Sequence, residues 1–454
     1  MPFLPHTESE RSEMLRAIGV KKAEDLFAGI PKAARFPGLK LPPAVSEPEV
    51  LAEMRYLAEA NHDAQSAACF LGAGAYHHYI PAAINHLLLR GEFYTAYTPY
   101  QPEISQGTLQ SIFEFQTLIA ALTGMEVANA SHYDGATAAA EAVILALNQS
   151  RGRRRVVMSP VLHPQYRQTI RTYLQGAGVH FAGDETPETY SAFQTRSRAK
   201  HLATCVDEST AVVVVSYPTF VGEVEDLTSL AEIVHTAGAL LAVAVNPIML
   251  GLLKPPGAMG ADIVFGEGQP LGIPLSYGGP YLGFFATRQA YLHKMSGRIA
   301  GETVDAKGRR GYALTLAARE QHIKRERASS NICTNQGLMA LAATIYLSLM
   351  GRRGLRQAAE LCYHRAGYAA ERLARIPGFQ VVSRFPFFNE FILRCPKSVA
   401  AINRNLLDRA EIIGGYDLGQ DYPCLANHML LAFTEMTPRG QIDKLAEALA
   451  QESL

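Results

Sequence analysis

A tyrosine-rich stretch between residues 94 and 107 holds the densest group of side chains that could do chemistry in this 454-residue chain. Most of these side chains carry neutral hydroxyl and amide donors, which could hold an anion in front of a rigid helix. A second interpretation stays open, because amphipathic tyrosines also favour contacts with another protein. The candidate residues are Tyr97, Tyr100, Gln101, Glu103, Ser105 and Gln106.

A second candidate is the start of a helix predicted after Asp134. Gly135, Ala136 and Thr137 open a run of small residues there. A helix N-terminus exposes free N–H groups and carries partial positive charge, so a phosphate could rest on it. The same small residues also suit a helix that packs closely on a sheet, and Asp134 would repel a phosphate. The pattern leaves both interpretations open.

Two further residues follow predicted strands, at the edge where open α/β sheets bind ligands. The ring of His163 could stack on a planar cofactor, or it could simply be hydrogen-bonded. Asn246 ends another predicted strand. If a pyridine ring lay nearby, its protonated nitrogen would need a carboxylate partner, and the amide of Asn246 cannot act as one.

The turn after the predicted strand 262–265 contains Gln269 and Pro270. In an α/β enzyme with an aldehyde cofactor, the amine that anchors the cofactor usually projects from such a turn. Neither Gln269 nor Pro270 can form an imine, and the chain has no lysine from Pro255 to His293. Lys254 precedes the strand rather than following it. This chain therefore lacks the expected anchor.

Composition excludes several classes of protein. The 42 basic and 42 acidic residues cancel, so we expect neither nucleic acid nor a membrane surface as a partner. No signal peptide and no run of eighteen apolar residues is visible, which favours the cytoplasm. The six cysteines form no CxxC pair, so we expect free thiols and no metal site. The basic cluster 151–155 is interpreted as a solvated lead-in to a strand, with a docking patch as the alternative.

The elements that must position these residues follow an α/β pattern from residue 66 to 325. Short runs that are apolar on both faces alternate with helical segments at 165–174 and 227–236, which predicts a mostly parallel, doubly wound sheet. The predicted strands are 155–158, 211–216, 240–245, 262–265 and 282–286.

The two ends of the chain differ from this pattern. Residues 1–65 predict a helical arm, in which Thr7 caps a helix over Glu8–Ile18 and Gly19 ends it. Residues 326–454 predict a smaller α+β domain. Its helices are expected at 336–350, 358–375 and 398–413, its strands at 379–383, 391–395 and 429–434, and its last helix after a Thr437 cap.

Long motifs in this chain resemble the glycine cleavage system P-protein. They lie in the family's order, and the resemblance covers nearly the whole chain from Pro5 onward. A chain of this length resembles the amino-terminal half of the long form, which is a separate subunit (subunit 1, or α) in many bacteria. The motifs are Tyr97-Thr-Pro-Tyr-Gln101, Glu103-Ile-Ser-Gln-Gly107, Ala128-Asn-Ala-Ser131, Ala136-Thr-Ala-Ala-Ala-Glu141, Lys254-Pro-Pro-Gly257, Pro274-Leu-Ser-Tyr-Gly-Gly-Pro280 and Ser329-Ser-Asn-Ile-Cys-Thr334.

The resemblance implies the fold of type I pyridoxal-phosphate enzymes and a role in glycine decarboxylation. It implies that the aminomethyl group passes to the lipoyl arm of the H-protein, within a system that also contains the T-protein and the L-protein. The cofactor lysine belongs to the partner subunit (subunit 2, or β), in an assembly of two copies of each subunit. In this chain Gln269 and Pro270 fall at the positions of the family's histidine and lysine, and Asn246 falls at the ring's carboxylate.

The resemblance therefore implies that the pocket formed by Gly135, Ala136, Thr137, His163 and Asn246 is vestigial, and that the partner subunit binds the cofactor covalently. It also implies that the loop 97–106 reaches the partner's site. One alternative is a structural or regulatory pseudoenzyme without a catalytic contribution. Another is a stand-alone enzyme that uses an unexpected lysine.

Overall fold

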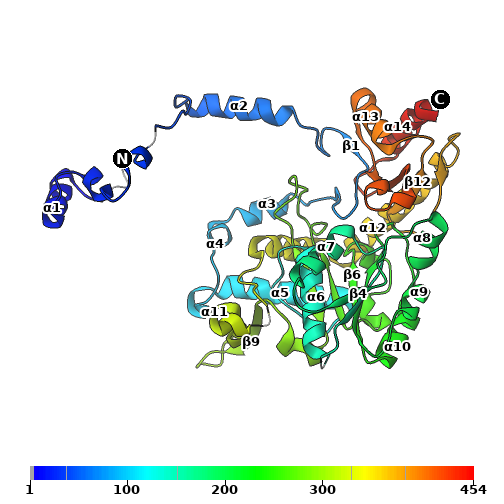
Figure 1. The fold of residues 1–454 in the computed structure, drawn as a ribbon, viewed down its shortest axis with the longest axis horizontal. Helices are drawn as coiled ribbons and strands as arrows, with labels where there is room; N and C mark the ends of the chain where they lie inside the picture. Colours follow the sequence, from blue (N-terminus) through cyan, green and yellow to red (C-terminus); the bar gives the residue numbers. More distant parts are fainter. Residues whose placement is uncertain (1–4, 37, 151, 329, 384, 454) are drawn as a thin grey trace. The chain divides into compact units, whose positions relative to one another are not determined.

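The computed structural model describes residues 5–36, 38–150, 152–328, 330–383 and 385–453 of the chain (Figure 1). Arg151, from the basic cluster, and Ser329, from one of the family motifs, lie outside these residues. The chain divides into two compact units, residues 1–61 and residues 62–454. The domain boundaries expected after residues 65 and 325 stay predictions.

The first unit contains the helices α1 (Glu8–Ile18) and α2 (Glu47–Glu59). The Thr7 hydroxyl accepts the Glu10 N–H, and the Glu10 carboxylate accepts the Thr7 N–H, which is a capping box. Gly19, in the left-handed conformation at φ 87°, ends α1. The predicted cap, helix and stop are confirmed. None of the described residues of this unit is buried.

The described residues of the second unit form a seven-stranded sheet in the order β2-β8-β7-β6-β5-β3-β4. The five strands from β7 to β4 run parallel, and β8 runs antiparallel to both of its neighbours. The five predicted strands are confirmed as β3 and β5 to β8, while β2 and β4 were not predicted. The strands are β2 (Val127–Ala128), β3 (Arg155–Met158), β4 (His180–Ala182), β5 (Thr210–Tyr217), β6 (Leu240–Val245), β7 (Ile263–Glu267) and β8 (Gly283–Thr287).

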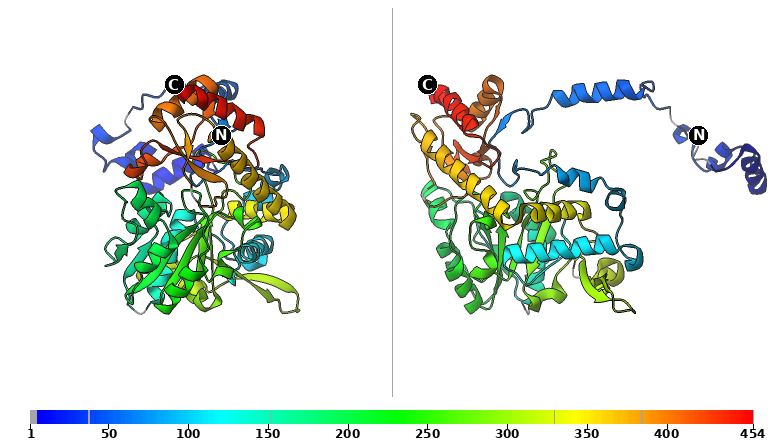
Figure 2. Two further views of the ribbon diagram at one scale, coloured as in Figure 1. Left: turned by 90° about the vertical axis from the view of Figure 1, so that its right-hand side faces the viewer. Right: turned by 180° about the vertical axis from the view of Figure 1, so that it is seen from behind.

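Both faces of this sheet are apolar and covered by helices (Figure 2). Because neighbouring strand residues point to opposite faces, Val213 and Val243 pack in one core and Val212 and Ala242 in the other. The first face is covered by α5 (Gln106–Thr123), α9 (Ala199–Thr204), α10 (Thr228–Thr236) and α12 (Gly337–Leu373), and the second by α6 (Gly135–Gln149) and α7 (Pro164–Tyr173). Further helices are α3 (Ala83–Leu88), α4 (Gly91–Tyr94), α8 (Tyr190–Arg196) and α11 (Gln321–Lys324).

A hairpin that the sequence did not predict, β9 (Ile299–Val304) and β10 (Arg310–Thr315), packs on α5. Two glutamines of α5 hold it through its backbone. The Gln106 amide donates to the Tyr312 carbonyl at 2.9 Å and accepts the Tyr312 N–H at 2.8 Å. Gln116 makes the same pair of bonds with Ala300, at 3.0 and 2.8 Å. The polar position in the apolar face of α5 is therefore an attachment point for the hairpin.

A four-stranded antiparallel sheet in the order β11-β12-β15-β14 forms the last part of the chain. It packs on the second half of α12, which breaks at Gly351 (φ 55°), and on α13 and α14. The Thr437 cap was wrong, because the Thr437 hydroxyl accepts the Thr434 N–H and Pro438 takes the cap position. The remaining elements are β1 (Ala68–Cys69), β11 (Gln380–Val381), β12 (Glu390–Arg394), α13 (Val399–Ala410), β13 (Ile412–Ile413), β14 (Tyr416–Asp417), β15 (His428–Ala432) and α14 (Arg439–Ala450).

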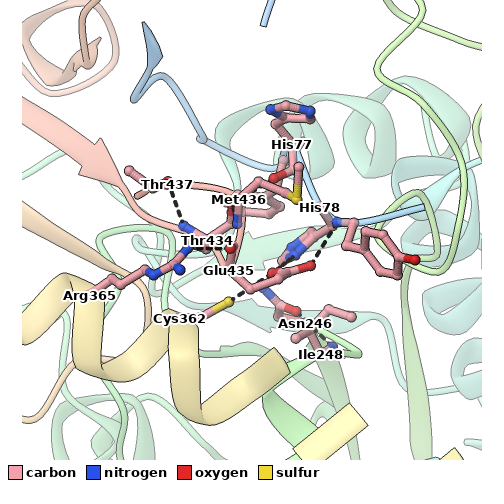
Figure 3. Close-up of polar contacts among 12 residues, drawn as sticks. His77, His78, Asn246, Ile248, Cys362, Arg365, Thr434, Glu435, Met436 and Thr437 are labelled. Atoms are coloured by element: carbon pink, nitrogen blue, oxygen red, sulfur yellow. Dashed lines mark hydrogen bonds and ion pairs between the residues drawn. The ribbon is translucent and has the colours of Figure 1, made fainter. Parts of the chain in front are cut away.

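A buried polar cluster joins this sheet to α12 and to the segment after β1 (Figure 3). The Glu435 carboxylate lies 2.7 Å from Nδ1 of His78, accepts the Tyr79 N–H at 2.8 Å and accepts the Cys362 thiol at 3.3 Å. His78 and Cys362 are buried, and the Glu435 side chain is 6% exposed. Burial acts to raise the pKa of Glu435, but the charge and hydrogen bond of His78 and the backbone N–H groups lower that pKa to about 2.

We expect this cluster to lose its stabilising effect in acid. The folded-state pKa of Glu435 lies below the ordinary value of 4.5, so the stabilisation is complete above pH 4.5 and is lost as the pH falls towards 2. A lowering from 4.5 to about 2 corresponds to about 3 kcal/mol. Urea unfolding of the chain and of Glu435→Gln should show a stability difference at pH 6 that shrinks towards pH 3.

A matched control is Glu360→Gln, because Glu360 pairs with Arg356 at the surface of α12. Surface ion pairs contribute little, so this variant should unfold within about 0.5 kcal/mol of the parent at both pH values. A stability difference for Glu435→Gln that is constant from pH 6 to pH 3 would contradict the ionised cluster.

Candidate functional site

A cleft lies at the carboxyl edge of the seven-stranded sheet, where β3, β5, β6 and β7 end. Its lining includes His163 after β3, Pro218 after β5, Asn246 after β6 and Pro270 after β7. Open α/β sheets bind their ligands at this edge. The structure therefore brings the predicted residues His163, Asn246 and Pro270 together in one cleft.

The start of α6, where a phosphate was considered, is bound by two carboxylates of the chain itself. Asp134 caps the helix, and its Oδ1 accepts the Thr137 N–H at 2.7 Å. Oε2 of Glu267, the last residue of β7, accepts the Gly135 N–H at 3.0 Å. These carboxylates occupy the helix donors that an anion would use. Thr137 serves the cap, because its hydroxyl accepts the Asp134 N–H at 3.2 Å.

Glu267 also holds the turn after its own strand. Its Oε1 accepts the N–H groups of Gln269 at 3.0 Å and of Leu282 at 2.9 Å. Burial raises the pKa of Glu267 to about 7, although its three backbone donors act to lower it. A second carboxylate in the cleft, Glu390, accepts the Ala73 N–H and the Tyr76 hydroxyl, each at 2.8 Å. Burial raises the pKa of Glu390 to about 7 as well.

Two aromatic rings already contact the ring of His163. Tyr166 stacks on it at 5.0 Å between ring centroids and 24° between planes, and Phe220 meets it edge-on at 4.8 Å. Its Nε2 lies 3.0 Å from the Ala73 carbonyl. The Tyr166 hydroxyl lies so close to Gly135 that a Cβ there would be 2.0 Å from it. A tyrosine thus fills the space between His163 and the start of α6.

The residues at the expected anchor positions have structural contacts. Gln269 is 1% exposed, and its amide bonds to both backbone groups of Tyr76 at 2.9 Å and to the Ile273 carbonyl at 2.8 Å. Pro270 has no amine to offer. Oδ1 of Asn246 accepts the Ile248 N–H at 3.0 Å, and its Nδ2 has no partner among the described residues (Figure 3).

These residues do not fit pyridoxal phosphate. The cofactor needs an amine for its aldehyde, donors for its phosphate and, in this fold, a carboxylate for its ring nitrogen. The cleft offers Pro270 at the first position, the carboxylates of Asp134 and Glu267 at the second, and the amide of Asn246 at the third.

The tyrosine loop lies away from this cleft, next to the β9–β10 hairpin. Tyr97 is 87% exposed and Tyr100 is 50% exposed. The Tyr100 hydroxyl accepts a bond from Nη2 of Arg298 at 3.4 Å, and the Arg298 guanidinium lies 5.6 Å from the Tyr100 ring centre. Gln101 and Glu103 are exposed. These side chains are free to meet another surface.

Gln106 and Ser105 connect the loop to the rest of the chain. The Gln106 amide is held by Tyr312 and also donates to the Pro102 carbonyl at 2.6 Å. Ser105 stands at the cap position of α5, but its side chain makes no capping bond. The loop therefore divides into an exposed part, which contains Tyr97 and Tyr100, and a part that attaches it to the hairpin.

Sequence reasoning missed Glu267, Tyr166, Glu390 and Arg298. A signal for Glu267 was present, since a single carboxylate ends an apolar strand just before the turn. Tyr166 and Glu390 gave none, because their role depends on which segments meet in space. Arg298 stands at the start of the unpredicted hairpin, so nothing indicated that it would be buried.

Comparisons with known proteins identify the family of the chain. A sequence profile of the family described as glycine cleavage system P-protein matches residues 1–449. A protein of Thermomicrobium roseum named probable glycine dehydrogenase (decarboxylating) subunit 1 is 54% identical over 451 residues, which cover 99% of each chain. A protein of the same name from Desulforamulus reducens is 53% identical over 450 residues, again covering 99% of each.

Solved structures agree with this result. A crystal structure of an inhibitor-bound glycine decarboxylase (P-protein) of the glycine cleavage system is 44% identical, covers all of both chains and has a TM-score of 0.87. A sphingosine-1-phosphate lyase of Burkholderia pseudomallei, 16% identical with a TM-score of 0.64 over 93% of this chain and 94% of that one, shares the fold. The α/β fold of type I pyridoxal-phosphate enzymes, expected from the sequence, is confirmed. The chain belongs to the glycine cleavage system P-protein family.

Proposed function

We propose that this chain is the subunit of a glycine decarboxylase that does not carry the cofactor lysine. With a second subunit it decarboxylates glycine on pyridoxal phosphate, and the aminomethyl group passes to the lipoyl arm of the H-protein. The family supports the reaction class, and the name subunit 1 of its relatives supports a second subunit.

The observation that supports this proposal is the turn after β7, which has no lysine although the chain has the fold of type I pyridoxal-phosphate enzymes. Pro270 stands at the anchor position, and Gln269 beside it is fixed to Tyr76 and Ile273. A chain of this family with such a turn needs an amine from another polypeptide. The partner subunit therefore binds pyridoxal phosphate covalently, and this chain alone is inactive.

The proposed assembly contains two copies of each subunit and works in the cytoplasm with the H-, T- and L-proteins. No described helix is both long and apolar enough to cross a membrane. The pocket formed by Gly135, Ala136, Thr137, His163 and Asn246 is proposed to be vestigial. Its support is the pair of carboxylates at the start of α6 and the two aromatic rings that contact His163.

The exposed part of the tyrosine loop is proposed to complete the partner's site. Tyr97 and Tyr100 present neutral hydroxyl donors on a loop that Gln106 attaches to the hairpin. A donor that is held in place before the reaction needs no reorganisation when charge develops on the substrate. Gln101, Glu103 and Ser105 belong to the same proposed surface.

We expect the double variant Tyr97→Phe with Tyr100→Phe to lower kcat/KM for glycine about tenfold or more in the assembled complex, because it removes two hydrogen bonds to a charged group. The measurement is glycine–bicarbonate exchange, with the assembly checked by sizing. Tyr363→Phe is a control, since Tyr363 is an exposed tyrosine of α12 outside the loop. Unchanged turnover by the double variant would instead favour the structural or regulatory pseudoenzyme.

We also expect this chain alone to take up no pyridoxal phosphate as an imine. The chain, its partner and the co-expressed pair are each incubated with the cofactor and reduced with borohydride. Covalent pyridoxyl label should be found on the partner only, and exchange activity should require both chains. Label on a lysine of this chain in the assembled pair, together with activity of this chain alone, would establish the stand-alone enzyme instead.

A further inference from the structure

A second pocket of the residue 62–454 unit lies beside the tyrosine loop. Its lining includes two arginines, Arg298 and Arg319, together with Lys294, Glu320 and Thr334. Arg298 connects this pocket to the loop, because its guanidinium faces the Tyr100 ring and donates to the Tyr100 hydroxyl. The pocket is separate from the cleft at the edge of the sheet, and the two share no lining residue.

Arg298 is a buried cation that has no carboxylate partner among the described residues. It is 4% exposed, and each acceptor it meets is neutral. Nη1 donates to the Thr334 hydroxyl at 3.1 Å and to the Asn335 side-chain carbonyl at 3.0 Å, and Nη2 donates to the Cys333 carbonyl at 2.6 Å. Its Nε is buried and has no partner among the described residues.

Arg319, the second arginine of the pocket, is partly buried and also donates to backbone carbonyls. Its Nη1 donates to the Leu292 carbonyl at 3.3 Å and its Nη2 to the Gly297 carbonyl at 2.7 Å. Its Nε is also buried without a partner among the described residues. Neither arginine forms a salt bridge among the described residues; burial lowers the pKa of Arg319, although the charge of the neighbouring Glu320 acts to raise it.

The pocket has an excess of positive charge. Among its charged side chains, Lys294, Arg298 and Arg319 face the single carboxylate of Glu320, which also lies 3.5 Å from His322. Ser330, which lines the pocket, donates its hydroxyl to the Glu141 carboxylate at 2.7 Å. Burial raises the pKa of Glu141, which disfavours the negative charge of this carboxyl group. A buried cation without a counter-charge is costly, so an incoming anion would stabilise this region.

We propose that Arg298 and Arg319 form a site for a small oxyanion, a carboxylate or a phosphate, with Tyr100 at its entrance. The planar guanidinium with a free Nε suits such a group, because its donors match the spacing of oxyanion oxygens. As part of the shared active site, this inference rests on the proposed function. There the anion is either the carboxylate of glycine or the phosphate of the cofactor held by the partner subunit.

The competing explanation is that both arginines only clamp backbone carbonyls. Arg153 provides a matched control for it. Nη1 of Arg153 donates to the carbonyls of Thr210, Ala237 and Gly238, and Arg153 forms no salt bridge among the described residues. It clamps backbone as Arg298 does, but it lines neither pocket. If both arginines only held backbone carbonyls, Arg298→Gln and Arg153→Gln would change phosphate binding by the same amount.

The experiment uses the co-expressed two-subunit complex and inorganic phosphate as the probe. Line broadening of the ³¹P signal, at saturating cofactor and without glycine, measures phosphate binding. Apo complex is measured in parallel, because the cofactor's own phosphate can fill the site. We expect the wild-type complex in at least one of these forms to bind phosphate, and Arg298→Gln and Arg319→Gln each to weaken that binding about tenfold or more. Arg298→Lys should restore part of the loss, and Arg153→Gln should bind within twofold of wild type.

Two further measurements, the KM for glycine and the rate of cofactor loss, identify which anion occupies the site. A rise in KM for glycine with unchanged cofactor retention assigns the site to the substrate carboxylate. Faster loss of cofactor with unchanged KM assigns it to the cofactor's phosphate. Equal phosphate binding, KM and cofactor retention in folded, assembled Arg298→Gln and Arg319→Gln complexes would overturn the site. If the wild-type complex lacks exchange activity but its phosphate binding depends on Arg298, the proposed function fails and the anion site stands.

Discussion

A single buried carboxylate, that of Glu267, is the contact on which the architecture of the first cleft depends. It accepts N–H groups from the start of α6, from the turn after β7 and from the residue before β8. One carboxylate therefore joins the start of α6 to the segment between β7 and β8, which is more than 130 residues away in the sequence. Among the described residues those N–H groups have no other acceptor, so loss of the carboxylate would leave buried donors unsatisfied. The anchor turn keeps its shape through Glu267.

This contact also decides which ligands the cleft can accept. A helix start in this fold normally faces an anion, but here the anion is already part of the chain. Glu267 and Glu390 both line the cleft, and burial raises the pKa of each to about 7. The second pocket has the opposite character, because the buried Arg298 and the partly buried Arg319 line it and neither forms a salt bridge among the described residues. Within one unit, the fold thus disfavours anions at the sheet edge and favours them beside the tyrosine loop.

Sequence patterns predicted the parts of the fold that depend on local periodicity. The five apolar runs and the capped first helix follow from neighbouring residues, and so does the end of the helix predicted over 336–350, where α12 breaks at Gly351. The β9–β10 hairpin could not be predicted in this way, since its strands are partly exposed and it is held by side-chain amides from α5. The same limit applies to the site. That Asn246 and Pro270 follow strands was readable, but the stacking of Tyr166 on His163 depends on tertiary packing.

Pro270 at the position expected for the cofactor lysine has to be considered together with its neighbours in the cleft. A lysine in place of Pro270 would supply an amine, but the start of α6 would still hold the carboxylates of Asp134 and Glu267. The Tyr166 hydroxyl would still lie against Gly135, where there is no room even for a Cβ. Removal of Glu267 would free a helix donor and at the same time release the turn that must present the lysine. The contacts that disfavour the cofactor in this cleft are therefore the same contacts that hold the start of α6 and the turn after β7 in place.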